Sequence, residues 1–108
     1  MVNASHYRYS VQWSARDNEY VGSVAEFPSL SWLDVDEMSA FAGIKQLTSD
    51  VVVEMLDSGE IPPLPLAERE YSGKLALRIP PELHRRLALE AGLQGVSLNR
   101  LLSAKLAG

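Results

Sequence analysis

The sequence contains no cysteine, which excludes a disulfide framework and metal sites built on thiolates. It has two histidines, His6 and His84, and neither has a second histidine at a spacing that would complete a metal site or a catalytic pair. Residues 1–10 contain no continuous hydrophobic run of the kind that forms a signal peptide or a membrane span. We therefore expect a soluble, cytoplasmic protein with no cofactor and no bound metal.

Charged residues are distributed unevenly along the chain. Residues 1–70 carry four basic and twelve acidic side chains, a net charge of −8, whereas residues 71–108 carry six basic and two acidic side chains, a net charge of +4. A basic module suits a polyanion, and an acidic one suits a basic protein or simply favours solubility. This asymmetry predicts two small modules with different partners.

The first thirty-three residues predict three antiparallel strands. Residues 7–14 alternate polar and apolar side chains, so one face of a strand is expected to be buried, with these residues on it: Tyr7, Tyr9, Val11 and Trp13. Asp17 and Asn18 favour a turn, and residues 20–27 form a second strand-like run, which completes a hairpin. Residues 30–33 indicate a short third strand.

A helix that covers this sheet is expected from Asp34 to about Ser58. Asp34 and Glu37 have the spacing of a capping box, and Gly59 suits the left-handed residue that often follows a helix. Apolar and small residues at steps of three and four form the stripe expected to lie on the sheet: Phe41, Ile44, Thr48, Val51 and Met55. Together these elements predict an α+β domain over residues 1–60.

The segment 61–70 contains Pro62, Pro63 and Pro65. Prolines lack a backbone donor and favour extended backbone, so we interpret this segment as a semi-rigid linker. It separates the first domain from a second domain over residues 71–108.

The second domain is predicted to be a strand followed by two helices. Residues 74–79 alternate, with Lys74, Ala76 and Arg78 on one face of the strand. The first helix is expected from residue 81 or 82 to about 91, and the second, capped by Ser97, from 98 to about 106.

The small size of this domain predicts that it oligomerises. A unit of 38 residues is below the roughly 40 residues under which isolated domains usually need a metal, a disulfide or oligomerisation. Without cysteine, oligomerisation remains, and pairing of the strand with its two-fold copy would make a ribbon that fits a DNA major groove.

The run 74–80, followed by residues 82–87 and 95–102, resembles the ribbon-helix-helix domain of Arc-type and MetJ-type repressors. The resemblance implies base contacts from Lys74, Ala76 and Arg78, although Ala76 offers only an apolar contact. It implies phosphate contacts at the start of the second helix, from Ser97, Leu98 and Asn99. The core of the dimer would then consist of leucines and one isoleucine: Leu75, Leu77, Ile79, Leu83, Leu87, Leu98, Leu101 and Leu102.

The whole chain resembles the HicB family of toxin-antitoxin antitoxins. Three segments carry this resemblance: residues 20–28, the acidic helix opening at residues 34–38, and residues 71–106. It implies an N-terminal domain with a partly degraded ribonuclease-H-like topology that binds a HicA-like ribonuclease toxin and neutralises it by steric occlusion. It also implies a C-terminal domain that forms a homodimer and represses its own operon by binding operator DNA, with a tetramer through the N-terminal domain left open.

Two alternatives concern function, and one concerns individual residues. The first alternative is a stand-alone transcriptional regulator whose N-terminal domain serves oligomerisation or ligand sensing. The second alternative is divalent-metal chemistry, suggested by the acidic residues Asp34, Asp36 and Glu37. Acids at the start of a helix more often cap the helix, and the first strand contains no acid that would complete a metal site. We therefore assign no catalytic residue. Trp13 and Trp32 are interpreted as sheet core, although an exposed Trp32 would be a good anchor for a protein interface.

Overall fold

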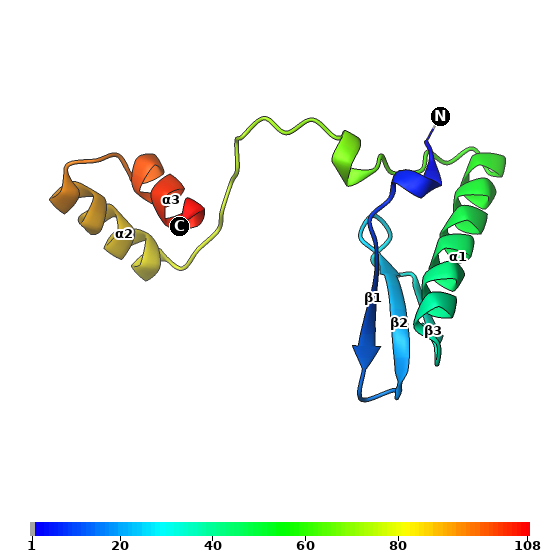
Figure 1. Cartoon of the computed structure of the whole chain (residues 1–108). Coiled ribbons are helices and arrows are strands. Elements are labelled where there is room, and N and C mark those ends of the chain that lie inside the picture. Colours follow the sequence, from blue (N-terminus) through cyan, green and yellow to red (C-terminus); the bar gives the residue numbers. More distant parts are fainter. Residues whose placement is uncertain (1) are drawn as a thin grey trace. The chain divides into compact units, whose positions relative to one another are not determined.

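The computed structural model describes residues 2–108, which divide into two compact units (Figure 1). The N-terminal unit ends at Tyr71, and the C-terminal unit comprises Ser72–Gly108. In the described part of the chain no helix is long and apolar enough to cross a membrane.

The N-terminal unit is built on an antiparallel sheet in the order β1-β2-β3, with β1 at Tyr9–Ser14, β2 at Glu19–Val24 and β3 at Ser31–Asp34. The 3-10 turn η1 (Ala4–His6) precedes it. Asn18 has a φ of 53°, a left-handed conformation that asparagine tolerates, so the β1–β2 turn forms where the sequence predicted it. The three-stranded antiparallel sheet of an α+β fold is confirmed.

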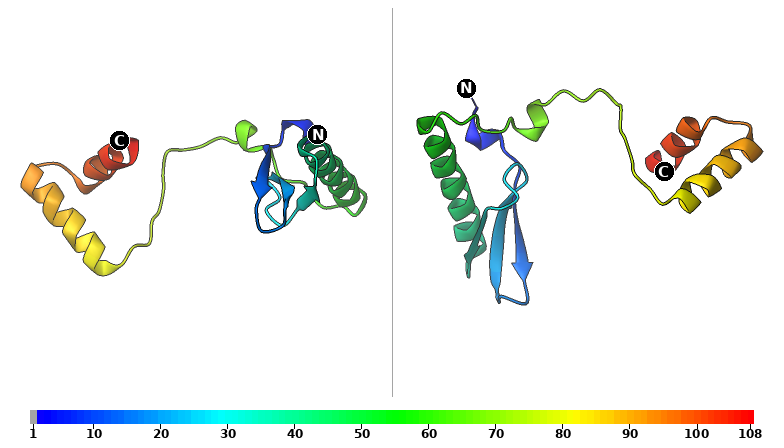
Figure 2. Two further views of the ribbon diagram at one scale, coloured as in Figure 1. Left: turned by 60° about the horizontal axis from the view of Figure 1, so that its bottom comes forward. Right: turned by 180° about the vertical axis from the view of Figure 1, so that it is seen from behind.

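Helix α1 (Glu37–Asp57) covers one face of the sheet (Figure 2). It begins later than predicted: its N-cap is Asp36, whose Oδ2 accepts from the Ser39 amide at 2.8 Å. Asp34 is the last residue of β3 instead, and its carboxylate accepts from the amide of Asp36. The expected end is confirmed, because Ser58 is the C-cap and Gly59 has a φ of +81°.

The buried stripe of α1 differs from the predicted one by a small rotation. The residues that are buried recur at steps of four: Ala40, Ile44, Thr48 and Val52. Phe41 is exposed at the flank of the helix, while Val51 and Met55 are half-buried. Gly22 decides this rotation, because a Cβ there would lie 2.7 Å from the carbonyl oxygen of Ala40. The helix therefore makes its closest approach to the sheet through small residues.

Residues 61–71, here called the proline strap, pack against the N-terminal unit instead of forming the separate linker expected over 61–70. Pro65 is fully buried, and the Tyr7 hydroxyl donates to the carbonyl oxygen of Pro63 at 2.7 Å. The strap contains the 3-10 turn η2 (Leu66–Glu68), and the Leu66 amide donates to Oε2 of Glu26 at 2.8 Å. Polar contacts to residues far away in the sequence thus hold this segment.

The C-terminal unit contains α2 (Pro81–Gln94) and α3 (Leu98–Ala107). Helix α2 runs through Gly92, three residues beyond its predicted end, and the chain reverses at Gly95, which has a φ of +70°. The amides of Gly95 and Val96 donate to carbonyls of the last turn, which closes the helix as a left-handed cap does. Residues 74–79 form no hydrogen-bonded strand, because a strand requires a partner and the single chain offers this segment none.

Candidate functional site

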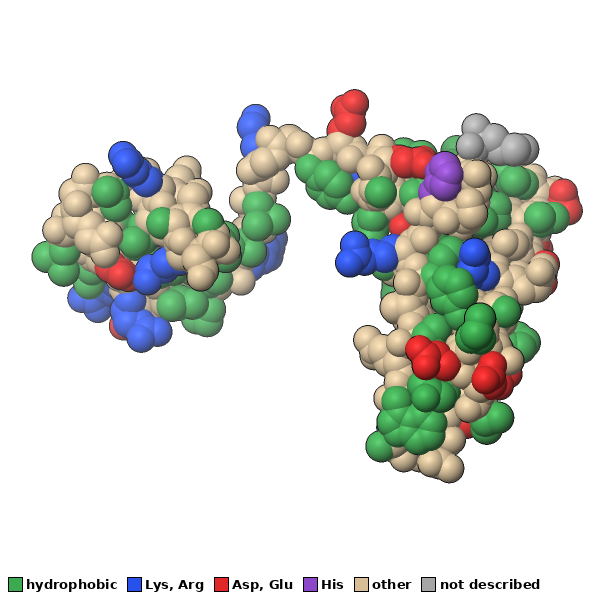
Figure 3. All heavy atoms as spheres, in the orientation of Figure 1, with side chains coloured by type: hydrophobic (Ala, Val, Ile, Leu, Met, Phe, Trp, Pro, Cys, Tyr) green, Lys and Arg blue, Asp and Glu red, His purple; other side chains and the backbone are tan. Residues whose placement is uncertain are grey.

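The predicted DNA-binding residues lie on the surface of the C-terminal unit. Lys74, Ala76 and Arg78 are all exposed. Figure 3 shows Lys and Arg side chains gathered on this unit. Within residues 2–108, one of its six basic residues forms a salt bridge, Lys105 with Glu90 at 3.2 Å, which joins α3 to α2. The other five remain available to an anion.

The start of α3 has the geometry of an anion site. The Ser97 hydroxyl oxygen accepts from the Arg100 amide at 3.1 Å, so Ser97 is the N-cap, as predicted. The amides of Leu98 and Asn99 are in the first turn, where helix geometry provides no intrahelical acceptor. These two donors lie at the positive end of the helix dipole, which favours a bound anion such as a phosphate.

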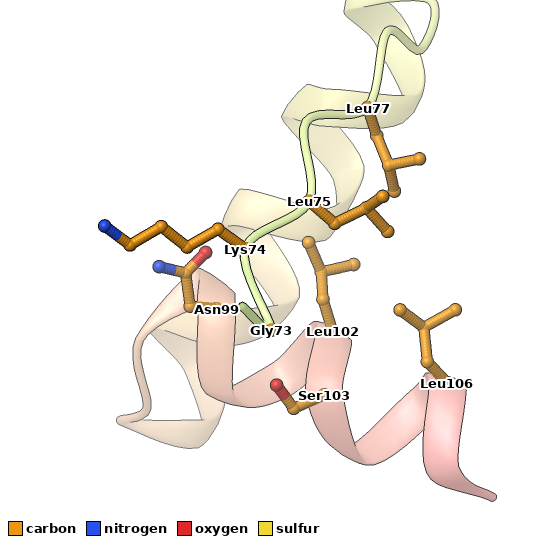
Figure 4. Close-up of a pocket in the computed structure, with 8 residues that line it drawn as sticks. All are labelled: Gly73, Lys74, Leu75, Leu77, Asn99, Leu102, Ser103 and Leu106. Carbon is orange, nitrogen blue, oxygen red and sulfur yellow. The ribbon is translucent and has the colours of Figure 1, made fainter. Parts of the chain in front are cut away.

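Lys74 and Asn99 come together beside this helix start. They line one hollow with leucines of the extended segment and of α3. In Figure 4 the side chains of Lys74 and Asn99 lie on one side of the extended segment, and those of Leu75, Leu77, Leu102 and Leu106 lie on the other. The structure therefore places a predicted base-contacting residue next to a predicted phosphate-contacting residue. The Lys74 side chain points away from the leucines, whereas Asn99 also lines the apolar groove.

The apolar side forms an open groove of about 340 Å³, here called the leucine groove. It contains six of the eight predicted dimer-core residues: Leu75, Leu77, Ile79, Leu87, Leu98 and Leu102. Leu75 is 75% exposed and Leu77 is 58% exposed. Of the two remaining residues, Leu101 is buried and Leu83 is half-buried. The C-terminal unit thus gathers its leucines on one side without covering them.

The acidic residues at the start of α1 act as structural caps. The backbone amide and hydroxyl of Ser39 both donate to Asp36, and these bonds hold the pKa of the Asp36 carboxyl below its ordinary value. Among residues 2–108, no group of three or more His, Asp or Glu side chains is arranged to hold a metal ion.

Neither tryptophan is buried in the sheet core, where both were predicted, and the exposed Trp32 corresponds to the alternative interpretation. Trp13 is half exposed and packs edge-on against Tyr20, with ring centroids 5.0 Å apart. Trp32 is 42% exposed. Its indole ring lies against Gly43 of α1, where an added Cβ would be 2.1 Å from Nε1 of Trp32. The small sheet is too narrow to bury its outer aromatic residues.

Sequence reasoning missed Glu26, which joins the proline strap to the sheet. Partial burial by itself would raise the pKa of the Glu26 carboxyl, but the backbone amides of Leu66 and Arg8 donate to it and hold its pKa below the ordinary value. Periodicity along the sequence could not indicate this role, because both partners of Glu26 are backbone amides of residues that lie 18 and 40 positions away in the sequence.

The family model described as "HicB family" matches residues 59–106. This segment contains the whole proline strap, the extended segment, α2 and all but the last residue of α3. No curated protein and no solved structure is significantly similar to the chain. The chain is thus similar to the HicB family over 48 of its 108 residues.

Proposed function

We propose that this protein is an antitoxin that represses its own operon through its C-terminal unit and neutralises a HicA-like ribonuclease toxin through its N-terminal unit. The observation that carries the proposal is the division of the C-terminal unit into an uncovered leucine groove and a separate basic side, within a segment that matches the HicB family.

The leucine groove supplies the force for dimerisation. Full burial of one leucine side chain contributes about 1.5 to 3 kcal/mol, so covering Leu75 and Leu77 of both copies offers several kcal/mol to association. The Lys74 amide donates to the Ser72 hydroxyl, whereas the backbone groups of residues 75–79 pair with no other strand in the described chain. The same segment of a second copy satisfies them as an antiparallel ribbon. Dimerisation thus covers the leucines and pairs the backbone in one step.

The ribbon presents the DNA-binding side chains. Alternation along residues 74–79 puts Lys74, Ala76 and Arg78 on the face opposite the leucines. Lysine and arginine donate to guanine acceptors in the major groove, and the free amides at the start of α3 suit a backbone phosphate. Base contacts then determine sequence preference, whereas the phosphate contact positions the ribbon.

Operator binding by Arg78→Ala tests the DNA-binding part of this proposal. Loss of a base-contacting arginine is expected to weaken binding to the protein's own promoter by about 1 to 3 kcal/mol without changing the dimer. Arg85→Ala on α2 is the matched control. Fluorescence anisotropy at a fixed salt concentration measures affinity, and light scattering measures the oligomer. Equal promoter affinity of Arg78→Ala and wild type would refute the ribbon.

Coexpression with the neighbouring gene tests the toxin-neutralising part. We expect the product of that gene, a small basic ribonuclease, to arrest growth alone and to be inactive when this chain is coexpressed. The N-terminal unit carries the net charge of −8 over residues 1–70, which complements a basic toxin and accelerates association. Copurification of the two proteins as a stable complex is the biochemical counterpart of this test.

A stand-alone transcriptional regulator is the second candidate, because the family match covers the C-terminal half and leaves the sheet unmatched. In that case the promoter would be bound, while no neighbouring gene product would arrest growth or copurify.

A further inference from the structure

The N-terminal unit has an open apolar groove between β1 and the beginning of α1. This feature, here called the β1 groove, has a volume of about 350 Å³ and is lined by Tyr9, Ser10, Val11, Glu37, Met38 and Phe41. Met38 is 81% exposed, and Phe41 packs edge-on against Tyr9 but leaves 43% of its surface in solvent. No sequence pattern indicated this groove, because the predicted stripe placed Phe41 in the core.

Strand β1 borders this groove and is an edge strand of the sheet. Its six residues, Tyr9–Ser14, include no charged residue and no proline. Charged side chains, prolines and bulges are the usual means by which proteins prevent an edge from pairing with another chain. The β1 edge therefore offers unpaired backbone groups next to an apolar hollow, the combination used when a peptide adds a strand to a sheet.

Glu37 lines this groove, and further acidic side chains belong to the neighbouring turn and strand ends. Figure 3 shows hydrophobic side chains bordered by Asp and Glu over the end of the sheet near the β1–β2 turn. Five acids belong to the β1–β2 turn, the start of β2, the end of β3 and the start of α1: Asp17, Glu19, Asp34, Asp36 and Glu37. Three basic residues adjoin this region: Arg8, which precedes Tyr9, Arg16 in the same turn, and Lys45, whose Nζ lies over the rings of Tyr9 and Phe41. The local charge remains negative.

We propose that the β1 groove and the β1 edge form the surface on which the basic toxin docks. This proposal rests on the antitoxin function proposed above and names the site that performs it. The occupant is an extended segment of the toxin that pairs with β1, inserts a hydrophobic side chain beside Met38 and brings a lysine or arginine to Glu37. A second copy of this chain fits poorly, because two units with eight excess negative charges each would repel one another.

Met38→Lys and Val53→Lys form a matched pair for the test. Both residues lie on α1, both are largely exposed, and each substitution adds one positive charge, but only Met38 lines the groove. The probe is the purified basic protein encoded next to this chain, titrated calorimetrically against the full-length protein. We expect Met38→Lys to weaken binding at least about tenfold, as loss of a central interface side chain does, and Val53→Lys to leave it unchanged.

Glu37→Lys and Glu54→Lys test the electrostatic part in the same way, because both acids belong to α1 and only Glu37 lines the groove. Glu37→Lys is expected to slow association, with a smaller difference from wild type at high salt. Hydrogen exchange of wild-type protein provides a measurement that needs no substitution. Amides of residues 9–14 are expected to become protected when the toxin binds.

The outcomes separate the two proposals. If wild-type protein does not bind the toxin, the antitoxin function fails and the docking surface fails with it. If wild-type protein binds but Met38→Lys and Glu37→Lys bind equally well, or protection appears away from β1, only the docking surface is refuted. If Met38→Lys reduces the oligomer size without the toxin, the groove binds a second copy and the proposed occupant is wrong.

Discussion

Replacement of Glu26 by glutamine should loosen the proline strap and make the N-terminal unit less stable. The two carboxylate oxygens of Glu26 accept from the Arg8 amide at 2.9 Å and the Leu66 amide at 2.8 Å. These bonds join the residue before β1, the segment after β2 and the strap. Glutamine has one acceptor oxygen, and its NH₂ group faces a backbone donor. Glu26→Gln therefore leaves one amide without its acceptor and removes the charge from the other bond.

The expected loss at neutral pH is about 1 to 2 kcal/mol. An unsatisfied buried donor costs about 1 to 3 kcal/mol, and the lower part of that range applies because Glu26 is only half-buried. The loss should also depend on pH. Hydrogen bonding lowers the pKa of Glu26 in the folded protein below its ordinary value of 4.5, so its stabilisation is present above that value and disappears as the pH falls through the folded pKa.

Urea denaturation followed by tryptophan fluorescence measures this effect, because both tryptophans, Trp13 and Trp32, belong to the N-terminal unit. Wild type and Glu26→Gln are compared at pH 7 and at successively lower pH, with Glu54→Gln, an exposed acid on α1, as the control. The difference between wild type and Glu26→Gln should shrink on acidification. A variant as stable as the control at pH 7, or a difference independent of pH, would refute the role of Glu26 in holding the strap.

Three further substitutions test the packing and the caps. Gly22→Ala puts a Cβ 2.7 Å from the carbonyl oxygen of Ala40, so it should destabilise the N-terminal unit by about 1 to 3 kcal/mol in the same urea assay. Ser97→Ala removes the cap of α3 and should cost about 1 kcal/mol, measured as a lower thermal midpoint by circular dichroism with Ser103→Ala as control. Gly95→Ala forces a side chain into a φ of +70° and should lower the same midpoint by an amount equivalent to about 1 kcal/mol.

Local patterns were sufficient for most of the secondary structure. Alternation along residues 7–14 predicted the first strand, and a left-handed glycine after Ser58 marked the end of the long helix. Ser97 was identified as a cap from its type and position alone. Such features are predictable because each depends on residues within one or two turns of one another.

The start of the long helix shows where local patterns became ambiguous. Asp34 and Asp36 each have an acceptor side chain suited to a helix start, and the capping-box spacing to Glu37 favoured Asp34. The sheet decided between them, because Asp34 is needed as the partner of Tyr20 at the end of β3. A tertiary pairing thus overrode a local signal of similar strength.

Charge and periodicity are properties of the linear chain, so they were enough to predict an acidic sheet-and-helix half and a basic half with leucines on one side of an extended segment. Three features emerged from the packing alone: the proline strap belongs to the first unit, Glu26 holds it, and Met38 and Phe41 border an open groove. Each of these depends on which distant residues meet, and the close approach of α1 at Gly22 sets the rotation that leaves Phe41 outside the core.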